Sequence, residues 1–133
     1  MFVDSFMTKN VVFVKENTLI YEAMELLIQH KISGLPVVDG EMNLKGLLTE
    51  KDVLSILSNP KVGIKDSVEY YMSKDIISFT EKATAADICQ FFIKSHIRRV
   101  PIVRDGKLVG IVSRRDIIEV IIKSRNDFNQ SVR

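Results

Sequence analysis

The feature that most constrains this chain is an internal repeat. Met7-Thr8-Lys9 aligns with Met72-Ser73-Lys74 at an offset of 65 residues. One extra residue in the first copy shifts the offset to 64 from Leu44 onward, where a predicted turn tolerates the insertion. The copies span residues 1–60 and 61–133, and turn-forming residues join them at 58–63. Each copy alone is too small to bury a reliable core, so we expect the two to share one.

Each copy predicts the same order of elements: strand, helix, strand, strand, helix. The first copy has a β-branched run at 11–14, a strand at 35–38 with proline near its start, and a returning strand at 44–48. Asn17 or Thr18 is expected to cap its first helix, and the apolar face of that helix includes Ile28. The second copy has strands at 76–79, 100–103 and 108–112, with a hairpin turn at 104–107. Apolar positions of the two closing helices are expected inside: Val53, Leu54, Ile56 and Leu57, and Ile117, Ile118, Ile121 and Ile122. The fold class is therefore α/β of the α+β type, with two β-α-β-β-α repeats packed sheet to sheet.

The composition excludes several classes of protein. With 133 residues, 46% hydrophobic content and a net charge of +2, the chain is not predicted to be disordered. The single cysteine, Cys89, forms no internal disulfide, and no apolar run is long enough to span a membrane. The amino terminus has no signal-peptide pattern, so a cytoplasmic location is expected.

Positive charge is concentrated in the second copy. Six basic residues and one acid, Asp105, lie between positions 98 and 115: Arg98, Arg99, Arg104, Lys107, Arg114 and Arg115. Such a cluster attracts an anion, or it is only a solvated face. No helix that reads duplex DNA is recognisable, although single-stranded nucleic acid remains an alternative ligand.

A short motif occurs once in each copy. Gly46-Leu47-Leu48-Thr49-Glu50-Lys51-Asp52 matches Gly110-Ile111-Val112-Ser113-Arg114-Arg115-Asp116. Helix capping explains the hydroxyl and the acid, whereas the glycine indicates close approach by a backbone or a ligand. A helix amino terminus also suits a phosphate, and an ionised aspartate suits ribose hydroxyls. The motif therefore outlines a mononucleotide site.

These stretches, together with 32–38 and 97–103, resemble a pair of CBS domains (cystathionine β-synthase type), the arrangement called a Bateman module. The resemblance covers residues 5–125. It implies a pseudo-twofold pair of repeats with two clefts between them. It also implies regulatory ligands that contain adenosine, namely AMP, ADP, ATP or S-adenosylmethionine. Such modules commonly form homodimers.

The resemblance also assigns roles to individual residues. Asp52 and Asp116 hold ribose hydroxyls in one cleft each, and Thr49 and Ser113 contact phosphate or ribose. Weaker candidates are Thr8 and Ser73. The expected walls around adenine are Val11, Val12, Ile76 and Ile77, with backbone groups near Leu35 and Val100.

Basic residues distinguish the two clefts. Arg98 and Arg99 are assigned across to the Asp52 cleft, and Arg114 to the Asp116 cleft. The first copy has Ser33-Gly34 where the second has the arginine pair. The resemblance therefore predicts one tight site and one weak or empty site.

No catalytic arrangement is visible, so we do not expect an enzyme. His30 and His96 have no second ligand at metal spacing, and no metal is expected. The leading hypothesis is an adenosine sensor that acts on a protein partner in trans. A dimerisation scaffold without ligand is the alternative, in which Thr49 and Ser113 only cap helices.

Overall fold

The computed structural model describes residues 1–59, 61, 63 and 65–131, and the side chains among them except Leu57 and 127–131. The predicted copy boundary at 60/61 and part of the turn-forming stretch lie outside these residues, as does the side chain of Leu57. The chain forms two compact units. Residues 12–76 and 106–108 form the α1–α2 unit, and residues 1–11, 77–105 and 109–133 form the α3–α4 unit.

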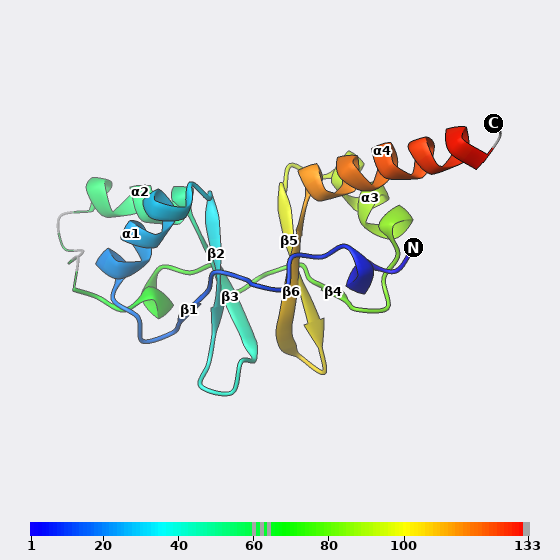
Figure 1. Cartoon of the computed structure of the whole chain (residues 1–133). Coiled ribbons are helices and arrows are strands. Elements are labelled where there is room, and N and C mark those ends of the chain that lie inside the picture. Colours follow the sequence, from blue (N-terminus) through cyan, green and yellow to red (C-terminus); the bar gives the residue numbers. More distant parts are fainter. Residues whose placement is uncertain (60, 62, 64, 132–133) are drawn as a thin grey trace. The chain divides into compact units, whose positions relative to one another are not determined.

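The α1–α2 unit has a three-stranded sheet and two helices (Figure 1). Strand β1 (Val14–Lys15) pairs in parallel with β2 (Gly34–Val38), which pairs antiparallel with β3 (Leu44–Thr49). The helices are α1 (Ile20–His30) and α2 (Glu50–Ser58), and a 3-10 turn, η2 (Val68–Tyr70), follows.

The α3–α4 unit repeats this plan. Its sheet has the order β4 (Phe79–Thr80), β5 (Arg99–Arg104) and β6 (Lys107–Ser113). The 3-10 turn η1 (Val3–Ser5) and the helices α3 (Ala85–Lys94) and α4 (Arg114–Ser131) complete it. The predicted 104–107 hairpin turn is confirmed, because Asp105 and Gly106 both have positive φ, 52° and 80°.

Each unit includes the segment that precedes the other repeat's first strand. Val3 is fully buried in the α3–α4 unit, and its N–H donates to Ala83 O at 2.8 Å. Thr8 forms an antiparallel bridge with Ile111 of β6. Ser73 forms the corresponding bridge with Leu47 of β3. These bridges cover strand edges that would otherwise present unpaired N–H and C=O groups.

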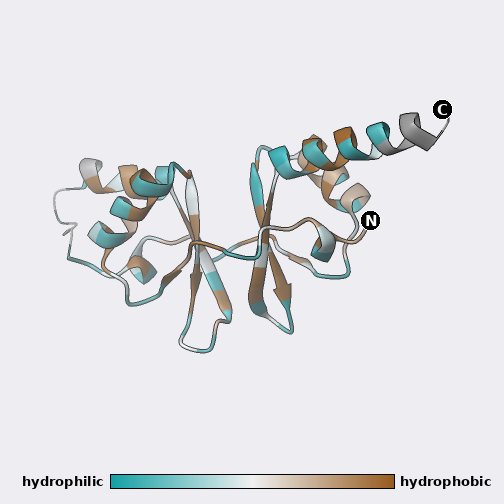
Figure 2. Cartoon of the chain, in the orientation of Figure 1, coloured by the Kyte–Doolittle hydropathy of each residue, from teal (hydrophilic) through white to brown (hydrophobic). Residues whose placement is uncertain are grey.

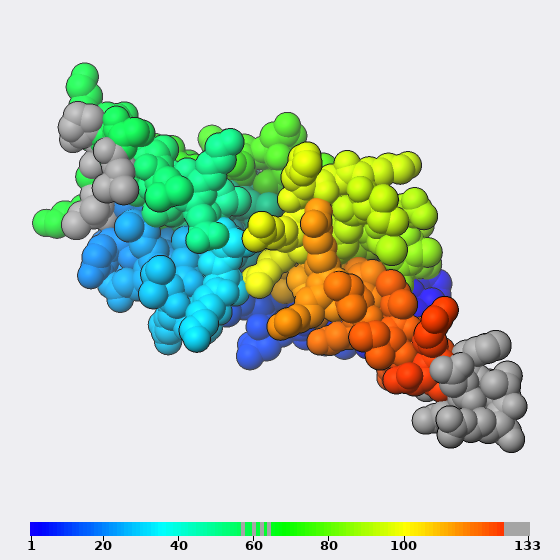
Figure 3. Space-filling view, turned by 90° about the horizontal axis from the view of Figure 1, so that it is seen from above, coloured from blue at the N-terminus to red at the C-terminus, as the bar shows by residue number. Residues whose placement is uncertain are grey.

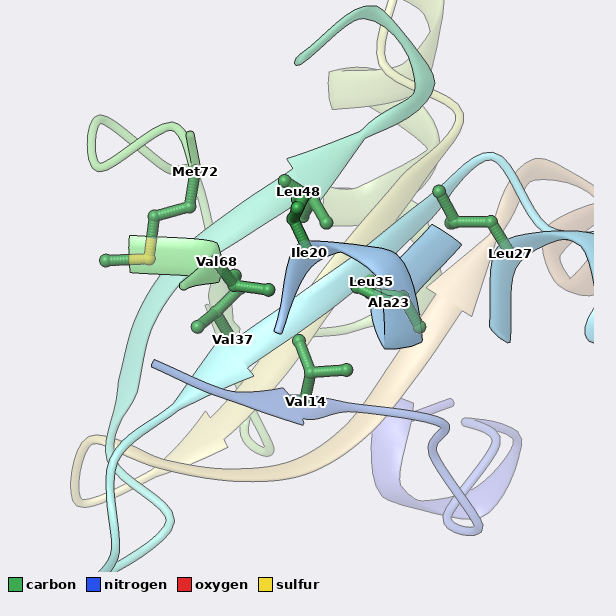
Figure 4. Packing of buried hydrophobic residues seen from close by; sticks show 9 residues of the cluster. All are labelled: Val14, Ile20, Ala23, Leu27, Leu35, Val37, Leu48, Val68 and Met72. Carbon is green, nitrogen blue, oxygen red and sulfur yellow. The ribbon is translucent and has the colours of Figure 1, made fainter. Parts of the chain in front are cut away.

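The core of the α1–α2 unit lies between its sheet and its helices (Figure 4). Val37, Leu48 and Ile20 are fully buried there. The strands of both units carry hydrophobic stretches, which are brown in Figure 2. A second cluster, which includes Ile88, Val100 and Val112, forms the core of the α3–α4 unit.

Several apolar helix positions expected inside are exposed. Of the expected residues of α4 only Ile117 is buried, whereas Ile118, Ile121 and Ile122 are more than half exposed. On the helices of the other unit, Ile28 is 81% and Leu54 is 62% exposed. A helix that covers a small sheet buries only one stripe, so an apolar residue outside that stripe stays in solvent.

Three local expectations were also wrong. Helix α1 has Leu19 at its N-cap without a side-chain hydrogen bond, while Thr18 Oγ1 accepts from Lys15 N at 3.0 Å. The first strands of both repeats are shorter than expected, because only Val14–Lys15 and Phe79–Thr80 join the ladders.

Candidate functional site

The β3–α2 junction is a reciprocal capping box. Thr49 Oγ1 accepts from Asp52 N at 3.3 Å, and Asp52 Oδ2 accepts from Thr49 N at 2.9 Å. The β6–α4 junction repeats it, with Ser113 Oγ accepting from Asp116 N at 3.2 Å and Asp116 Oδ2 accepting from Ser113 N at 2.8 Å. The capping interpretation of both motifs is therefore confirmed, and it fixes the orientation of both carboxylates.

A third capping box lies at the start of α3. Asp87 Oδ2 accepts from Thr84 N at 3.0 Å, and Thr84 Oγ1 accepts from Asp87 N at 3.2 Å. The hydrogen bonds from Thr84 hold the pKa of Asp87 below its usual value. The signal was present in the sequence as Thr-x-x-Asp and was not recognised. Because α3 carries none of the expected site residues, the capping geometry alone does not identify a ligand site.

The two motif aspartates differ in what else they contact. Ser73 Oγ lies 3.3 Å from Oδ1 and 3.5 Å from Oδ2 of Asp52, and donates to this carboxylate. Its counterpart Thr8 contacts β6 through its main chain, and within the described part of the chain Oδ1 of Asp116 receives no hydrogen bond. Asp116 therefore has an oxygen available to a ligand, whereas Asp52 is already partly satisfied.

The motif glycines make room for methionines. A Cβ on Gly46 would lie 2.8 Å from Met72 Sδ and 2.8 Å from the Ser73 carbonyl oxygen. A Cβ on Gly110 would lie 2.8 Å from Met7 Cγ. The close approach expected at these positions is therefore made by Met7, Met72 and the backbone of the bridging segments.

The expected wall residues divide between the units. Leu35, Val12 and Ile76 belong to the unit of Asp52. Val100, Val11 and Ile77 belong to the unit of Asp116. Leu35 and Val100 are fully buried, Val11, Val12 and Ile76 are half-buried, and Ile77 is 47% exposed. Their roles against adenine remain predictions.

The basic residues have different surroundings. Arg98 is exposed and Arg99 half-buried, and both belong to the unit of Asp116. The main-chain oxygen of Arg98 accepts from Arg114 N at 3.0 Å at the start of α4. Their assignment across to the Asp52 cleft stays a prediction.

Arg114 has a structural contact that the sequence did not indicate. Its Nη2 donates to Ser95 O at 2.6 Å and to Phe92 O at 3.4 Å, and its Nε donates to Ile97 O at 3.1 Å. The guanidinium thereby satisfies carbonyls at the end of α3, and it lies 6.0 Å from the centre of the Phe92 ring. Only Nη1 has no hydrogen-bond partner among the described residues, so Arg114 has fewer donors for a phosphate than expected.

A family profile described as "CBS domain" matches residues 3–59 and 65–123. The chain belongs to the CBS domain family. Its two sheets and their helices agree with the α+β fold of a CBS pair. The sheet-to-sheet placement of the repeats stays a prediction.

Curated relatives include proteins of very different lengths. The Methanocaldococcus jannaschii protein MJ1225 is 33% identical over 115 residues, which cover 86% of this chain and 41% of that protein. The CBS domain-containing protein YhcV of Bacillus subtilis is 36% identical over 84% of this chain and 79% of its own. Inosine-5′-monophosphate dehydrogenase of Aquifex aeolicus is 35% identical, but this CBS pair spans only 24% of it.

Solved CBS pairs are similar over nearly the whole chain. CBSX2 of Arabidopsis thaliana in complex with AMP has a TM-score of 0.84 and 27% identity, covering 93% of this chain and 98% of that one. The CBS pair of MJ0100, in complex with 5′-methylthioadenosine and S-adenosyl-L-methionine, has a TM-score of 0.77 and 29% identity, with the same coverages. Relatives of this fold therefore bind adenosine-containing molecules.

Neither a membrane-spanning helix nor a metal-binding cluster is present among the described residues. Within residues 1–59, 61, 63 and 65–131, no helix has the length and apolarity needed to cross a bilayer. In the same part of the chain, no three His, Cys, Asp or Glu side chains are grouped to hold a metal ion.

Proposed function

We propose that this CBS pair is a non-catalytic regulatory module that binds an adenosine-containing ligand and signals to a protein partner in trans. Asp52 and Asp116 hold ribose hydroxyls. The assignment of Arg98 and Arg99 favours the Asp52 cleft, but we place the stronger site at Asp116, because Ser73 already donates to Asp52. Similarity to pairs solved with AMP and with S-adenosyl-L-methionine supports this ligand class.

The observation that carries the proposal is the fixed carboxylate of Asp116. One oxygen is held by the cap of α4, and the other receives no hydrogen bond among the described residues. A carboxylate accepts hydrogen bonds but donates none when ionised, so its complement is a neutral diol rather than a phosphate. A ribose presents such a diol, and hydrogen bonds to a charged acceptor are the stronger class.

We further propose that two copies of the chain associate through their helices. Ile28 of α1 and its repeat counterpart Ile93 of α3 are 81% and 70% exposed. Leu54 of α2 and its counterpart Ile118 of α4 are 62% and 56% exposed. Apolar exposure at matching positions of both repeats suits a self-complementary interface. The change Ile118→Glu is expected to shift the protein from dimer to monomer in analytical ultracentrifugation, and a wild-type protein that sediments as a monomer contradicts this part.

Calorimetry with AMP, ADP, ATP and S-adenosylmethionine tests the ligand proposal. The purified chain is first stripped of any bound ligand by unfolding and refolding. Binding of at least one compound is expected, and Asp116→Ala should weaken it more than Asp52→Ala does. If none of the four binds at millimolar concentration, the scaffold alternative replaces the sensor. If the ligand-free protein instead binds single-stranded nucleic acid, with an affinity that falls steeply with salt, the alternative of a nucleic-acid-binding module is supported.

A further inference from the structure

A hollow of about 220 Å³ opens in the α3–α4 unit beside the proposed ribose site. Helix α4 contributes Asp116, Glu119, Val120 and Lys123, whose spacing places them on one helix face. The amino-terminal segment contributes Met1, Ser5 and Phe6 from the opposite side. Figure 3 shows this segment (blue) next to α4 (orange).

The size of the hollow indicates part of a ligand. Pockets that enclose a whole drug-sized molecule measure roughly 300–1,000 Å³. At about 220 Å³ this space is too small for a complete nucleotide. It adjoins Asp116, however, and therefore suits a substituent on a ribose that Asp116 holds.

The charges in the hollow follow an order along α4. Asp116 is followed by the acid Glu119, the apolar Val120 and, one turn further, the base Lys123. Val120 is half-buried, while Glu119 and Lys123 are exposed and free to turn toward a ligand. Acidic and basic groups line the hollow together, and a lining with both signs of charge suits a zwitterionic group better than a phosphate, which carries negative charge alone.

The first repeat lacks this arrangement. Ser55 and Asn59 occupy the positions that correspond to Glu119 and Lys123. Tyr71 replaces Phe6, and its hydroxyl donates to Asp66 Oδ2 at 2.6 Å. The opposite charges of Glu119 and Lys123 therefore occur only beside Asp116 and have no counterpart beside Asp52.

We propose that the hollow holds the zwitterionic amino-acid end of an adenosyl sulfonium ligand whose ribose is bound by Asp116. Glu119 receives the ammonium group, Lys123 pairs with the carboxylate, and the methylenes lie against Val120 and Phe6. This inference rests on the proposed function and selects among its ligands: S-adenosylmethionine is preferred to AMP at this site.

The test compares three ligands that share adenosine. The 133-residue chain carries Asp52→Ala, so that only the Asp116 site titrates, and its melting curve is compared with that of the unsubstituted chain. Calorimetry then measures S-adenosylmethionine, 5′-methylthioadenosine, which lacks the amino acid, and AMP. We expect S-adenosylmethionine to bind roughly tenfold more tightly than 5′-methylthioadenosine, since two exposed ion pairs are together worth about one decade in affinity.

Glu119→Gln and Lys123→Gln should each reduce this preference to about threefold and leave the affinity for 5′-methylthioadenosine unchanged. The matched controls Glu22→Gln and Lys94→Gln, at exposed helix positions outside the hollow, should keep the full preference. Equal affinities for S-adenosylmethionine and 5′-methylthioadenosine, tighter binding of AMP, or a preference that survives both hollow variants overturns the inference alone. If none of the three ligands binds the unsubstituted chain, the proposed function fails as well.

Discussion

Asp116 has an observed role in capping α4 and a proposed role as a ribose acceptor, and Asp87, the aspartate of the third capping box, supplies the control. Asp116→Ala removes the carboxylate that accepts from Ser113 N in the capping box of α4, together with the proposed ribose acceptor, and leaves the bond from the backbone N of residue 116 to Ser113 Oγ. Asp87→Ala removes the equivalent carboxylate from the capping box of α3, where no ligand role is proposed. The hydrogen bonds in the two boxes are 2.8 and 3.2 Å for Asp116 and 3.0 and 3.2 Å for Asp87. The pair therefore separates a loss of helix capping from a loss of binding.

The expected magnitudes follow from these contacts. Loss of the hydrogen bond from Ser113 N to the Asp116 carboxylate in Asp116→Ala should lower the free energy of unfolding by about 1 kcal/mol. For a chain of this size that corresponds to a fall in Tm of roughly 3–6 °C. A hydrogen bond to a charged acceptor contributes about 1.5–3 kcal/mol, so loss of one ribose contact should raise Kd about 10- to 100-fold.

Thermal unfolding and calorimetry on the same samples measure both quantities. Asp87→Ala should lower Tm yet leave Kd within about twofold of the unsubstituted chain, as expected for an independent position. The reasoning is refuted if Asp116→Ala binds ligand as tightly as the unsubstituted chain. It is also refuted if Asp87→Ala weakens binding as much as Asp116→Ala, because capping would then account for the whole effect.

Three further predictions concern stability. Arg114→Ala should lower the free energy of unfolding by about 1 kcal/mol, because carbonyls at the end of α3 lose their donor, and an unchanged urea midpoint contradicts this role. Gly46→Ala should lower the free energy of unfolding by about 1–3 kcal/mol. The loss should exceed that of Gly110→Ala, because the new Cβ at position 46 meets the backbone oxygen of Ser73 as well as a methionine side chain. Equal urea midpoints for the two variants contradict that order. The hydrogen bond and charge of Asp66 raise the pKa of Tyr71 to about 12, and the same hydrogen bond lowers the pKa of Asp66. The stability linked to Tyr71 should therefore be lost as pH rises from 10 to 12, and that linked to Asp66 as pH falls below about 4. Tyr71→Phe should abolish the loss of stability between pH 10 and 12 in a pH series of melting curves. If the variant still loses stability in this range, another group is responsible.

The order of elements and the local chemistry of the motifs could be predicted from the sequence. The apolar runs at 35–38 and 100–103, the Asp105-Gly106 turn and both capping boxes depend on neighbours a few residues apart, and such contacts repeat wherever the pattern repeats. The cap of α1 was predicted wrongly because Thr18 uses its hydroxyl to close the turn to Lys15. The box at Thr84 and Asp87 was missed although its spacing is the same.

The sequence by itself determined that the chain is a doubled β-α-β-β-α unit with two similar hydroxyl–aspartate caps, because periodicity and capping are local properties. Only the tertiary structure decided which segments join which unit, because the bridges of Thr8 to β6 and of Ser73 to β3 connect residues far apart in the chain. It also decided that Arg114 caps α3, that Ile28 and Ile118 stay exposed, and that Ser73 donates to Asp52 while Asp116 keeps an oxygen open. Burial and hydrogen-bond partners depend on what lies opposite a side chain in space, which a repeat pattern does not specify.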